Sequence, residues 1–351
     1  MACVTAGFAV FAPQVWVLAR EGFPAEIWPA EGEFVTVAGG GVGAAGPFAD
    51  LPEAAQTRLL ESGGRALLVD RGGEMLAGYG PDIDAETRMN SFSLVKSLVG
   101  ALVLRAHADG LVPDLDVPLA DYLGADAPRA TLREALEMRS GLIVGGEPAK
   151  SVEDAGFSPF GPLARLYAFG LDATMGDLDV DPEAQGSFVY QSVNTALLGA
   201  VLEAVYDRPL PEILSEQIWR PAGAAEAYWR AVPETVEVSA YCCLYARPVD
   251  WVAVGRFLLD NGSAADPFLP EDLWHAWLLP QLAPEVRREG AYGWHLRHDV
   301  LDREGAPVGG AFAYFMGHGG QMLYLMPSED LVVVRFGEQP QLLHSTLYDL
   351  F

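Results

Sequence analysis

Residues 93–108 read SLVKSLVGALVLRAHA, and the interpretation of the whole chain starts from this stretch. Its apolar residues recur at helical spacing, which predicts a buried helix that ends near Gly110. On such a helix Ser93 and Lys96, three positions apart, share one face. Lys96 is one of two lysines in the chain, the other being Lys150, among 22 residues that are Lys or Arg. A lysine inside an apolar helix, three residues after a serine, indicates chemistry rather than surface charge.

Ser93 and Lys96 together fit nucleophilic catalysis. A serine hydroxyl is a weak nucleophile that needs a base in contact with it. Lysine serves as that base when burial among apolar groups lowers its pKa, whereas arginine cannot serve because it does not deprotonate. Ser93 would also lie in the first turn, where the backbone N–H groups of a helix favour negative charge. We therefore predict Ser93 as the nucleophile and Lys96 as its base.

Strand patterns lie near both ends of the chain, and helical patterns fill its middle. The predicted strands are 65–70 and 74–80, joined as a hairpin, and then 311–317, 321–327 and 331–337. The predicted helices include 53–61, 194–205 and 342–350, and a capping box at Thr131 opens another. These elements predict an α+β fold, with an antiparallel sheet built from both chain ends and flanked by helices, plus a mostly helical subdomain over about 115–285.

Two segments differ in their expected roles. We expect residues 1–52 to form an apolar extension and loop, and residues 53–351 to form a single domain. The first 19 residues carry no charge, so they lack the basic start of a standard signal peptide. Pro13 and the small polar residues weaken a membrane span, so we expect this segment to fold onto the domain. The compartment, cytoplasmic or exported, and the oligomeric state stay open.

Three short motifs, in order along the chain, resemble a known family. SFSLVKSLVGALV (91–103) resembles the first box of the serine β-lactamase and penicillin-binding superfamily, nearest to class C β-lactamases, family VIII esterases and 6-aminohexanoate-dimer hydrolases. Tyr190-Gln191-Ser192 resembles the second box of that family, Tyr-x-Asn. His318-Gly319-Gly320 resembles the third box, which is Lys-Thr-Gly or His-x-Gly. The resemblance runs from about residue 65 to residue 337 and implies a β-lactamase/transpeptidase-like fold.

The resemblance implies roles for the residues of the second and third boxes. Tyr190 would exchange protons with Lys96 and the leaving group; the other interpretation is a core tyrosine. Ser192 replaces the family's Asn, so substrate hydrogen bonding there is altered. His318 replaces the Lys of β-lactamases, or is a strand histidine without a catalytic role. The oxyanion hole would combine the N–H of Ser93 with that of Gly320 or Gln321, just after Gly319.

These roles predict a serine hydrolase that cleaves an ester or a linear amide of a small substrate through an acyl-enzyme on Ser93. A β-lactamase or DD-peptidase is the alternative. It is ranked second because its substrates carry a carboxylate, which a mostly neutral His318 in an acidic protein recognises poorly. A second alternative is a catalytically inactive family member that acts as a binding module. The sequence does not name the substrate.

Composition excludes other classes of function. The formal charge of −26 argues against a nucleic-acid partner. Residues 41–46 match G-x-G-x-x-G, but Pro47 prevents the helix that would hold a dinucleotide, so no cofactor is expected. Zinc-ligand spacing is absent, so no metal is expected. Cys242 and Cys243 are interpreted as unpaired buried residues, because adjacent cysteines would pair under strain.

Smaller assignments complete the set of predictions. The histidines other than His318 are expected mostly on the surface. Asp250 resembles a family residue at a helix start, and we interpret it as a structural cap. Trp294 either lines the pocket or packs in the core.

Overall fold

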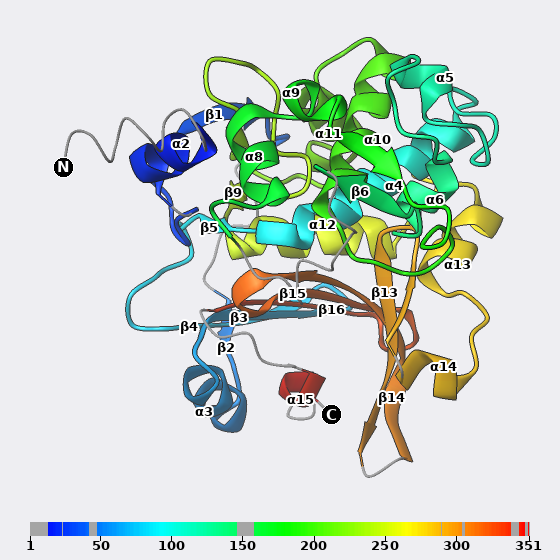
Figure 1. The fold of residues 1–351 in the computed structure, drawn as a ribbon. Helices are drawn as coiled ribbons and strands as arrows, with labels where there is room; N and C mark the ends of the chain where they lie inside the picture. Colours follow the sequence, from blue (N-terminus) through cyan, green and yellow to red (C-terminus); the bar gives the residue numbers. More distant parts are fainter. Residues whose placement is uncertain are drawn as a thin grey trace.

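The computed structural model describes residues 13–22, 24–41, 48–145, 158–288, 290–303, 306–337, 344–347 and 350. An eight-stranded sheet divides the molecule (Figure 1). Its strands, in spatial order, are β12 (Ala291–Gly293), β13 (Leu296–Arg303), β14 (Ala306–Gly317), β15 (Gln321–Met326), β16 (Leu331–Gly337), β3 (Gly64–Arg71), β4 (Glu74–Tyr79) and β2 (Ala49–Asp50). Neighbours are antiparallel except β2, which runs parallel to β4. The predicted α+β fold with a sheet from both chain ends is confirmed.

Helices cover both faces of this sheet. On one face, α12 (Pro248–Leu259) contacts β16, β3 and β15, with α4 (Val95–Ala108) and α10 (Ser192–Tyr206) beyond it in the helical part. On the other face lie α3 (Glu53–Glu61) and α15 (His344–Leu347), drawn below the sheet in Figure 1. The predicted helix 53–61 is confirmed at both ends. Within the predicted helix 342–350, the structure describes helix α15 over His344–Leu347, and residues 342, 343, 348 and 349 lie outside the described residues.

The side chains of β16 alternate between the two hydrophobic cores on either face of the sheet. Val332, Val334 and Phe336 face the core shared with α4, α10 and α12. Leu331 and Val333 face the smaller core on the side of α3. Because successive side chains of a strand point to opposite faces, a continuous apolar run such as LVVV is what a central strand covered on both sides requires.

Helix α4 is buried on all sides, which explains why its sequence is apolar nearly throughout. It begins at Val95, directly after the 3₁₀ turn η1 (Phe92–Leu94), so Ser93 precedes the α-helix by two residues. The predicted capping box is present: Thr131 Oγ1 accepts the Glu134 N–H at 3.2 Å, and Glu134 accepts the Thr131 N–H at 2.8 Å. It opens only the short helix α6 (Leu132–Leu136).

The middle of the chain holds strands as well as helices. The further helices are α5 (Ala120–Leu123), α8 (Pro162–Phe169), α9 (Asp172–Met175), α11 (Leu210–Leu214), η2 (Ser215–Trp219), α13 (Glu271–Leu278) and α14 (Pro284–Arg288), with η3 (His318–Gly320) and η4 (Pro327–Glu329) near the end. A second sheet has the order β1 (Glu33–Val37), β8 (Ala227–Ala231), β9 (Leu244–Ala246) and β5 (Met89–Asn90). Two-stranded pairs are β6 (Leu142–Val144) with β7 (Leu178–Val180), and β10 (Gly262–Ser263) with β11 (Asp266–Pro267).

The N-terminal region joins the fold through a helix and a strand. Helix α2 (Pro13–Glu21) contacts α8, and the Glu21 carboxylate meets the Arg230 guanidinium at 3.0 Å with both side chains buried. β1 pairs with β8. Residues 1–12, and 42–47 with most of the glycine motif, lie outside the described residues. Within the described part of the chain, no helix has the length and apolarity that a membrane crossing needs. The domain boundary at residue 52 stays a prediction.

The prediction of unpaired cysteines is wrong for the adjacent pair. Cys242 and Cys243 form a disulfide. The Cys242 N–H donates to the Ser239 carbonyl at 2.9 Å, and Cys243 has a positive φ of 70°. This tight turn brings the two side chains together, which the sequence reasoning did not anticipate.

Candidate active site

The nucleophile candidate and its base are in direct contact. Lys96 Nζ donates to Ser93 Oγ at 2.7 Å and to the Tyr241 carbonyl at 2.8 Å. Lys96 is only 2% exposed. Burial disfavours the ammonium form of a lysine, and a neutral amine can accept the serine proton. The spacing of three residues therefore gives the contact that the sequence predicted.

A strained turn presents Ser93. Phe92 has a φ of 43°, which is unfavourable for a bulky residue. The side chain of buried Asn90 accepts the Phe92 N–H at 2.8 Å and donates to the Tyr245 hydroxyl at 3.1 Å. Ser91 Oγ accepts the Leu244 N–H at 3.1 Å. Sequence reasoning missed Asn90, although a polar residue before the Ser-x-x-Lys motif at the end of a short strand was the available signal.

Tyr190 lies at the same place. It precedes α10, and Lys96 Nζ is 5.1 Å from the centroid of its ring. Ser93, Lys96 and Tyr190 thus come from the turn before α4, from α4 itself and from the start of α10. The structure brings together the three predicted catalytic residues.

The three residues line one small cavity. Its described lining is Ser93, Lys96, Ser97, Tyr190, Tyr292, His295, Arg297, Tyr314 and Met316. The last five come from β12, the turn after it, β13 and β14, and none was predicted as a site residue. Tyr314 and Met316 are alternate residues of β14, so both face the same side of the sheet.

The residues of the predicted third box lie differently. The His318 side chain is exposed, and its ring meets the Phe92 ring edge-on at 5.4 Å between centroids. The Gln321 side chain is buried and bonds the N–H and carbonyl of Gly337 at 2.9 and 3.0 Å. The Gly320 carbonyl accepts from Arg335 at 2.8 Å. None of the residues from His318 to Gln321 is among the described residues that line the cavity.

Ser192 is also placed apart from Ser93. It is buried at the first residue of α10 and lines a second cavity with Val144, Leu163 and Thr174. Gln191 lines the same cavity and donates to the Leu142 carbonyl at 3.1 Å. Tyr190 and Ser192 therefore face two different spaces.

Comparison with known proteins identifies the family. The family model described as Beta-lactamase matches residues 53–345. The chain belongs to the beta-lactamase family. The 6-aminohexanoate-dimer hydrolase of Paenarthrobacter ureafaciens is 27% identical over 307 residues, which cover 83% of this chain and 76% of that protein.

Two solved structures share the beta-lactamase fold with this chain. A putative 6-aminohexanoate-dimer hydrolase from Bacillus anthracis has a TM-score of 0.72 at 18% identity, covering 91% of this chain and 89% of that one. A D-stereospecific amidohydrolase from Streptomyces sp. has a TM-score of 0.60 at 21% identity, covering 82% and 94%. The predicted membership of the β-lactamase-like superfamily is confirmed, and the known members in these comparisons are hydrolases.

His295 fixes the wall of the cavity in this beta-lactamase family member. Its Nδ1 lies 2.8 Å from the Leu136 carbonyl, and its Nε2 lies 2.9 Å from Thr195 Oγ1. Its own carbonyl accepts from Ser97 Oγ at 2.5 Å. Complete burial lowers the pKa of His295 to about 4, against a smaller opposite effect of its hydrogen bond to the Leu136 carbonyl. His295 is therefore neutral near pH 7, with Nδ1 donating to Leu136 and Nε2 accepting from Thr195.

The expected surface position is wrong for two histidines. His295 and His298 are buried, and burial lowers the pKa of His298 to about 3. His295 lies in the turn between β12 and β13, and His298 lies in β13. Trp294 packs against the main core and is not among the described residues that line the cavity.

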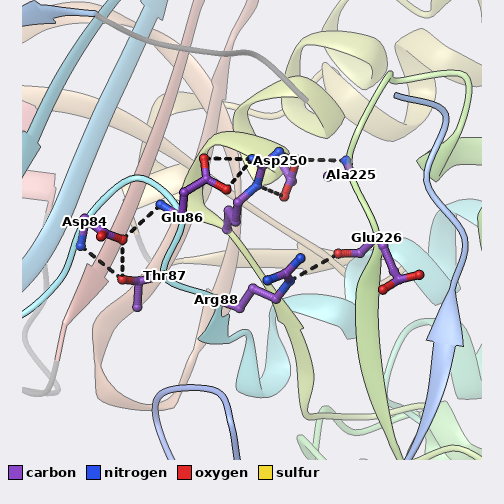
Figure 2. Close-up of polar contacts among 8 residues, drawn as sticks. Asp84, Glu86, Thr87, Arg88, Ala225, Glu226 and Asp250 are labelled. Atoms are coloured by element: carbon purple, nitrogen blue, oxygen red, sulfur yellow. Dashed lines mark hydrogen bonds and ion pairs between the residues drawn. The ribbon is translucent and has the colours of Figure 1, made fainter. Parts of the chain in front are cut away.

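An ion-pair network supports the segment that leads to Ser93 (Figure 2). Arg247 bonds the Glu86 carboxylate at 3.1 and 3.2 Å and the Asp250 carboxylate at 2.8 and 2.9 Å. Asp250 also accepts the Ala225 N–H at 2.9 Å. The prediction that Asp250 caps its own helix is wrong, because α12 has no side-chain cap. Asp250 instead holds α12 against the segment before β8. Among the described residues, no group of three or more His, Cys, Asp or Glu could hold a metal.

Proposed function

We propose that this protein is a serine hydrolase that cleaves an ester or a linear amide of a small substrate through an acyl-enzyme on Ser93. The observation that carries the proposal is the 2.7 Å contact between Lys96 Nζ and Ser93 Oγ, with the amine buried. A nucleophile in contact with a base is the arrangement that acyl transfer needs. The names of the hydrolase and the amidohydrolase compared above support an amide or a related ester as substrate.

Acylation follows from this geometry. Lys96 takes the proton of the Ser93 hydroxyl. Ser93 Oγ then forms a bond to the substrate carbonyl carbon, and the carbonyl oxygen becomes an oxyanion. The N–H of Ser93 and that of Gly320 or Gln321 are the proposed donors to this oxyanion. The bond to the leaving alcohol or amine then breaks, and the leaving group takes a proton from the Lys96–Tyr190 pair.

Deacylation reverses these roles. Water gives a proton to the Lys96–Tyr190 pair and attacks the acyl carbon, and the C–Oγ bond breaks with return of a proton to Ser93. Tyr190 is a proposed member of this relay because its ring lies beside Lys96. Ser192 and His318 remain proposed substrate contacts, Ser192 for a substrate that extends to the second cavity and His318 from the exposed rim.

Intact-mass measurement tests the proposal and its alternatives. Wild-type protein and Ser93→Ala are each incubated with 4-nitrophenyl esters, 6-aminohexanoate dimer and a penicillin, and adducts are mapped by peptide sequencing. We expect a transient acyl adduct on Ser93 with an ester or the amide, and a loss of turnover by several orders of magnitude in Ser93→Ala. Faster turnover of the penicillin than of the esters would favour a β-lactamase. Absence of any adduct, including one with a fluorophosphonate, would favour the inactive binding module.

A further inference from the structure

The Cys242–Cys243 disulfide lies between two residues that contact the segment of the proposed nucleophile and base. On its N-terminal side, the Tyr241 carbonyl accepts a hydrogen bond from Lys96 Nζ at 2.8 Å. On its C-terminal side, the Leu244 carbonyl accepts the Ser91 N–H at 2.9 Å, and the Leu244 N–H donates to Ser91 Oγ at 3.1 Å. This short segment therefore holds the proposed base directly, and it holds the proposed nucleophile through the turn that presents it.

Hydrogen bonds tie the backbone of the two cysteines to strand β8. The Cys242 carbonyl accepts from Trp229 Nε1 at 2.9 Å, and the Cys243 carbonyl accepts the Arg230 N–H at 3.0 Å. The Cys242 N–H donates to the Ser239 carbonyl at 2.9 Å. Trp229 and Arg230 belong to β8, so this strand supports the disulfide turn.

The disulfide restrains a backbone conformation that is unfavourable for cysteine. Cys243 has a φ of 70°, which lies in the left-handed region that favours glycine. A bond between the side chains of neighbouring residues closes a short ring around the peptide group that joins them. This ring limits the φ and ψ angles that both residues can adopt, and breaking the bond removes the limit.

One of the two sulfur atoms is the better target for a reductant. Cys242 is partly exposed, whereas Cys243 is fully buried. A thiolate of a dithiol would attack Cys242 Sγ, break the S–S bond and release Cys243, which takes a proton and becomes a thiol. The second thiol of the reductant then displaces Cys242 as a thiol and closes a cyclic disulfide. Two electrons and two protons pass from the dithiol to the protein.

We propose that the Cys242–Cys243 disulfide positions the base Lys96 and makes the hydrolase sensitive to dithiol reductants. With the disulfide formed, the Tyr241 carbonyl holds the Lys96 amine against Ser93 Oγ. After reduction the turn relaxes, the carbonyl moves, and the amine is no longer fixed at a distance for proton transfer. A displacement of about 1 Å in such a group lowers a rate by about a hundredfold. This inference rests on the proposed hydrolase function, because it describes a control of the same site.

Reduction of the folded protein tests the proposal. The third cysteine of the chain is removed in Cys3→Ser, so that new thiols come from Cys242 and Cys243 alone. The protein is treated with dithiothreitol, separated from it by gel filtration, and assayed with 4-nitrophenyl acetate, and a sample is alkylated for intact mass. We expect two alkylated thiols and a kcat lower by about ten- to a hundredfold. KM should change little, because Lys96 acts in both acylation and deacylation, and reoxidation should restore kcat.

Two variants of the Cys3→Ser protein separate the backbone restraint from the loss of the sulfur atoms. They are Cys242→Ala/Cys243→Gly and Cys242→Ala/Cys243→Ala. Glycine adopts a φ of 70° readily, whereas alanine does so only with strain. The glycine variant should therefore keep a kcat several times higher than that of the alanine variant. Neither variant should respond to dithiothreitol, which controls for effects of the reagent elsewhere.

A reversible fall in kcat, with the melting temperature still above the assay temperature, supports the positioning role. Equal kcat in the two redox states, a disulfide that excess dithiothreitol leaves intact, or a fall in kcat that only follows unfolding overturns it while Ser93 acylation stands. A glycine variant no more active than the alanine variant also overturns it, because the conformation of Cys243 would then not matter. Oxidised protein that hydrolyses neither 4-nitrophenyl acetate nor 6-aminohexanoate dimer and forms no fluorophosphonate adduct at Ser93 overturns the hydrolase function, and the positioning role with it.

Discussion

Gly100 of α4 lies directly against His295. A Cβ added at Gly100 would stand 2.5 Å from His295 Cβ and 2.9 Å from the Trp294 carbonyl oxygen. Only glycine therefore allows α4 to approach the turn between β12 and β13 so closely. That turn is flanked by Tyr292 and Arg297, which line the cavity together with His295.

Gly100→Ala should push this turn away from α4. We expect a loss of about 1–3 kcal/mol in the free energy of unfolding, the usual range for overpacking a core. kcat/KM for a 4-nitrophenyl ester should also fall, because the cavity wall moves. Urea denaturation and initial rates measure the two effects. Gly176→Ala is the matched control, since its added Cβ meets nothing within 4 Å. Wild-type stability and activity in Gly100→Ala would contradict the close contact.

Lys96→Arg tests whether Lys96 acts as a base. Arginine stays protonated and cannot accept the serine proton, so kcat should fall almost as far as in Lys96→Ala, by about three orders of magnitude or more. The measurements are steady-state turnover and the rate of fluorophosphonate labelling at Ser93. The same exchange at Lys150, the other lysine, controls for composition. Near-normal kcat in Lys96→Arg would reduce Lys96 to an electrostatic partner.

Tyr190→Phe tests the proton relay. Removal of the phenolic hydroxyl leaves the ring beside Lys96 and Arg297, so the melting temperature should stay within a few degrees of wild type. Turnover should drop about a hundredfold or more, the range for a general acid–base group. Tyr228→Phe is the control, because it makes the same change at a ring that stacks on Trp28 and is not among the described residues that line the cavity. If both variants turn over substrate equally fast, Tyr190 has no part in the mechanism.

Local patterns were sufficient for much of the fold. Strands β3, β4, β15 and β16 follow short apolar runs bounded by turn residues, and helices α3 and α10 follow apolar residues at helical spacing. Strand β13 was missed because its sequence, LRHDVLDR, is polar and has no clear alternation. Its place comes from pairing with β14, a tertiary contact that no local pattern encodes.

The same division applies to the site. Ser93, Lys96 and Tyr190 could be found because the motif residues that carry them are local. Arg297 and Tyr314 become neighbours only through the register of β13 on β14. Asp250 could be marked as structural, but its partners Ala225 and Glu86 depend on the fold. Residues that complete a cavity from several elements are therefore the part that sequence reasoning missed.

The buried, neutral His295 should make stability depend on pH. Its pKa is about 4 in the folded protein and about 6.5 in the unfolded chain. Between these values the unfolded chain binds a proton that the folded protein does not. The contribution of His295 to the free energy of unfolding is therefore complete above pH 6.5 and is lost as the pH falls toward 4. At pH 5 the loss corresponds to about 2 kcal/mol.

Urea denaturation at pH 7.5 and pH 5 measures this dependence in wild type and in His295→Gln. Protonation of the many carboxylates also changes stability with pH, but it does so equally in both proteins and cancels in their difference. We expect the fall in unfolding free energy between the two pH values to be about 2 kcal/mol larger in wild type. His275→Gln, at an exposed histidine of α13, should behave as wild type. Equal pH dependence in wild type and His295→Gln would mean that His295 is already protonated in the folded protein. Its Nε2 could not then accept the Thr195 hydroxyl, and the assignment of hydrogen bonds around His295 would have to change.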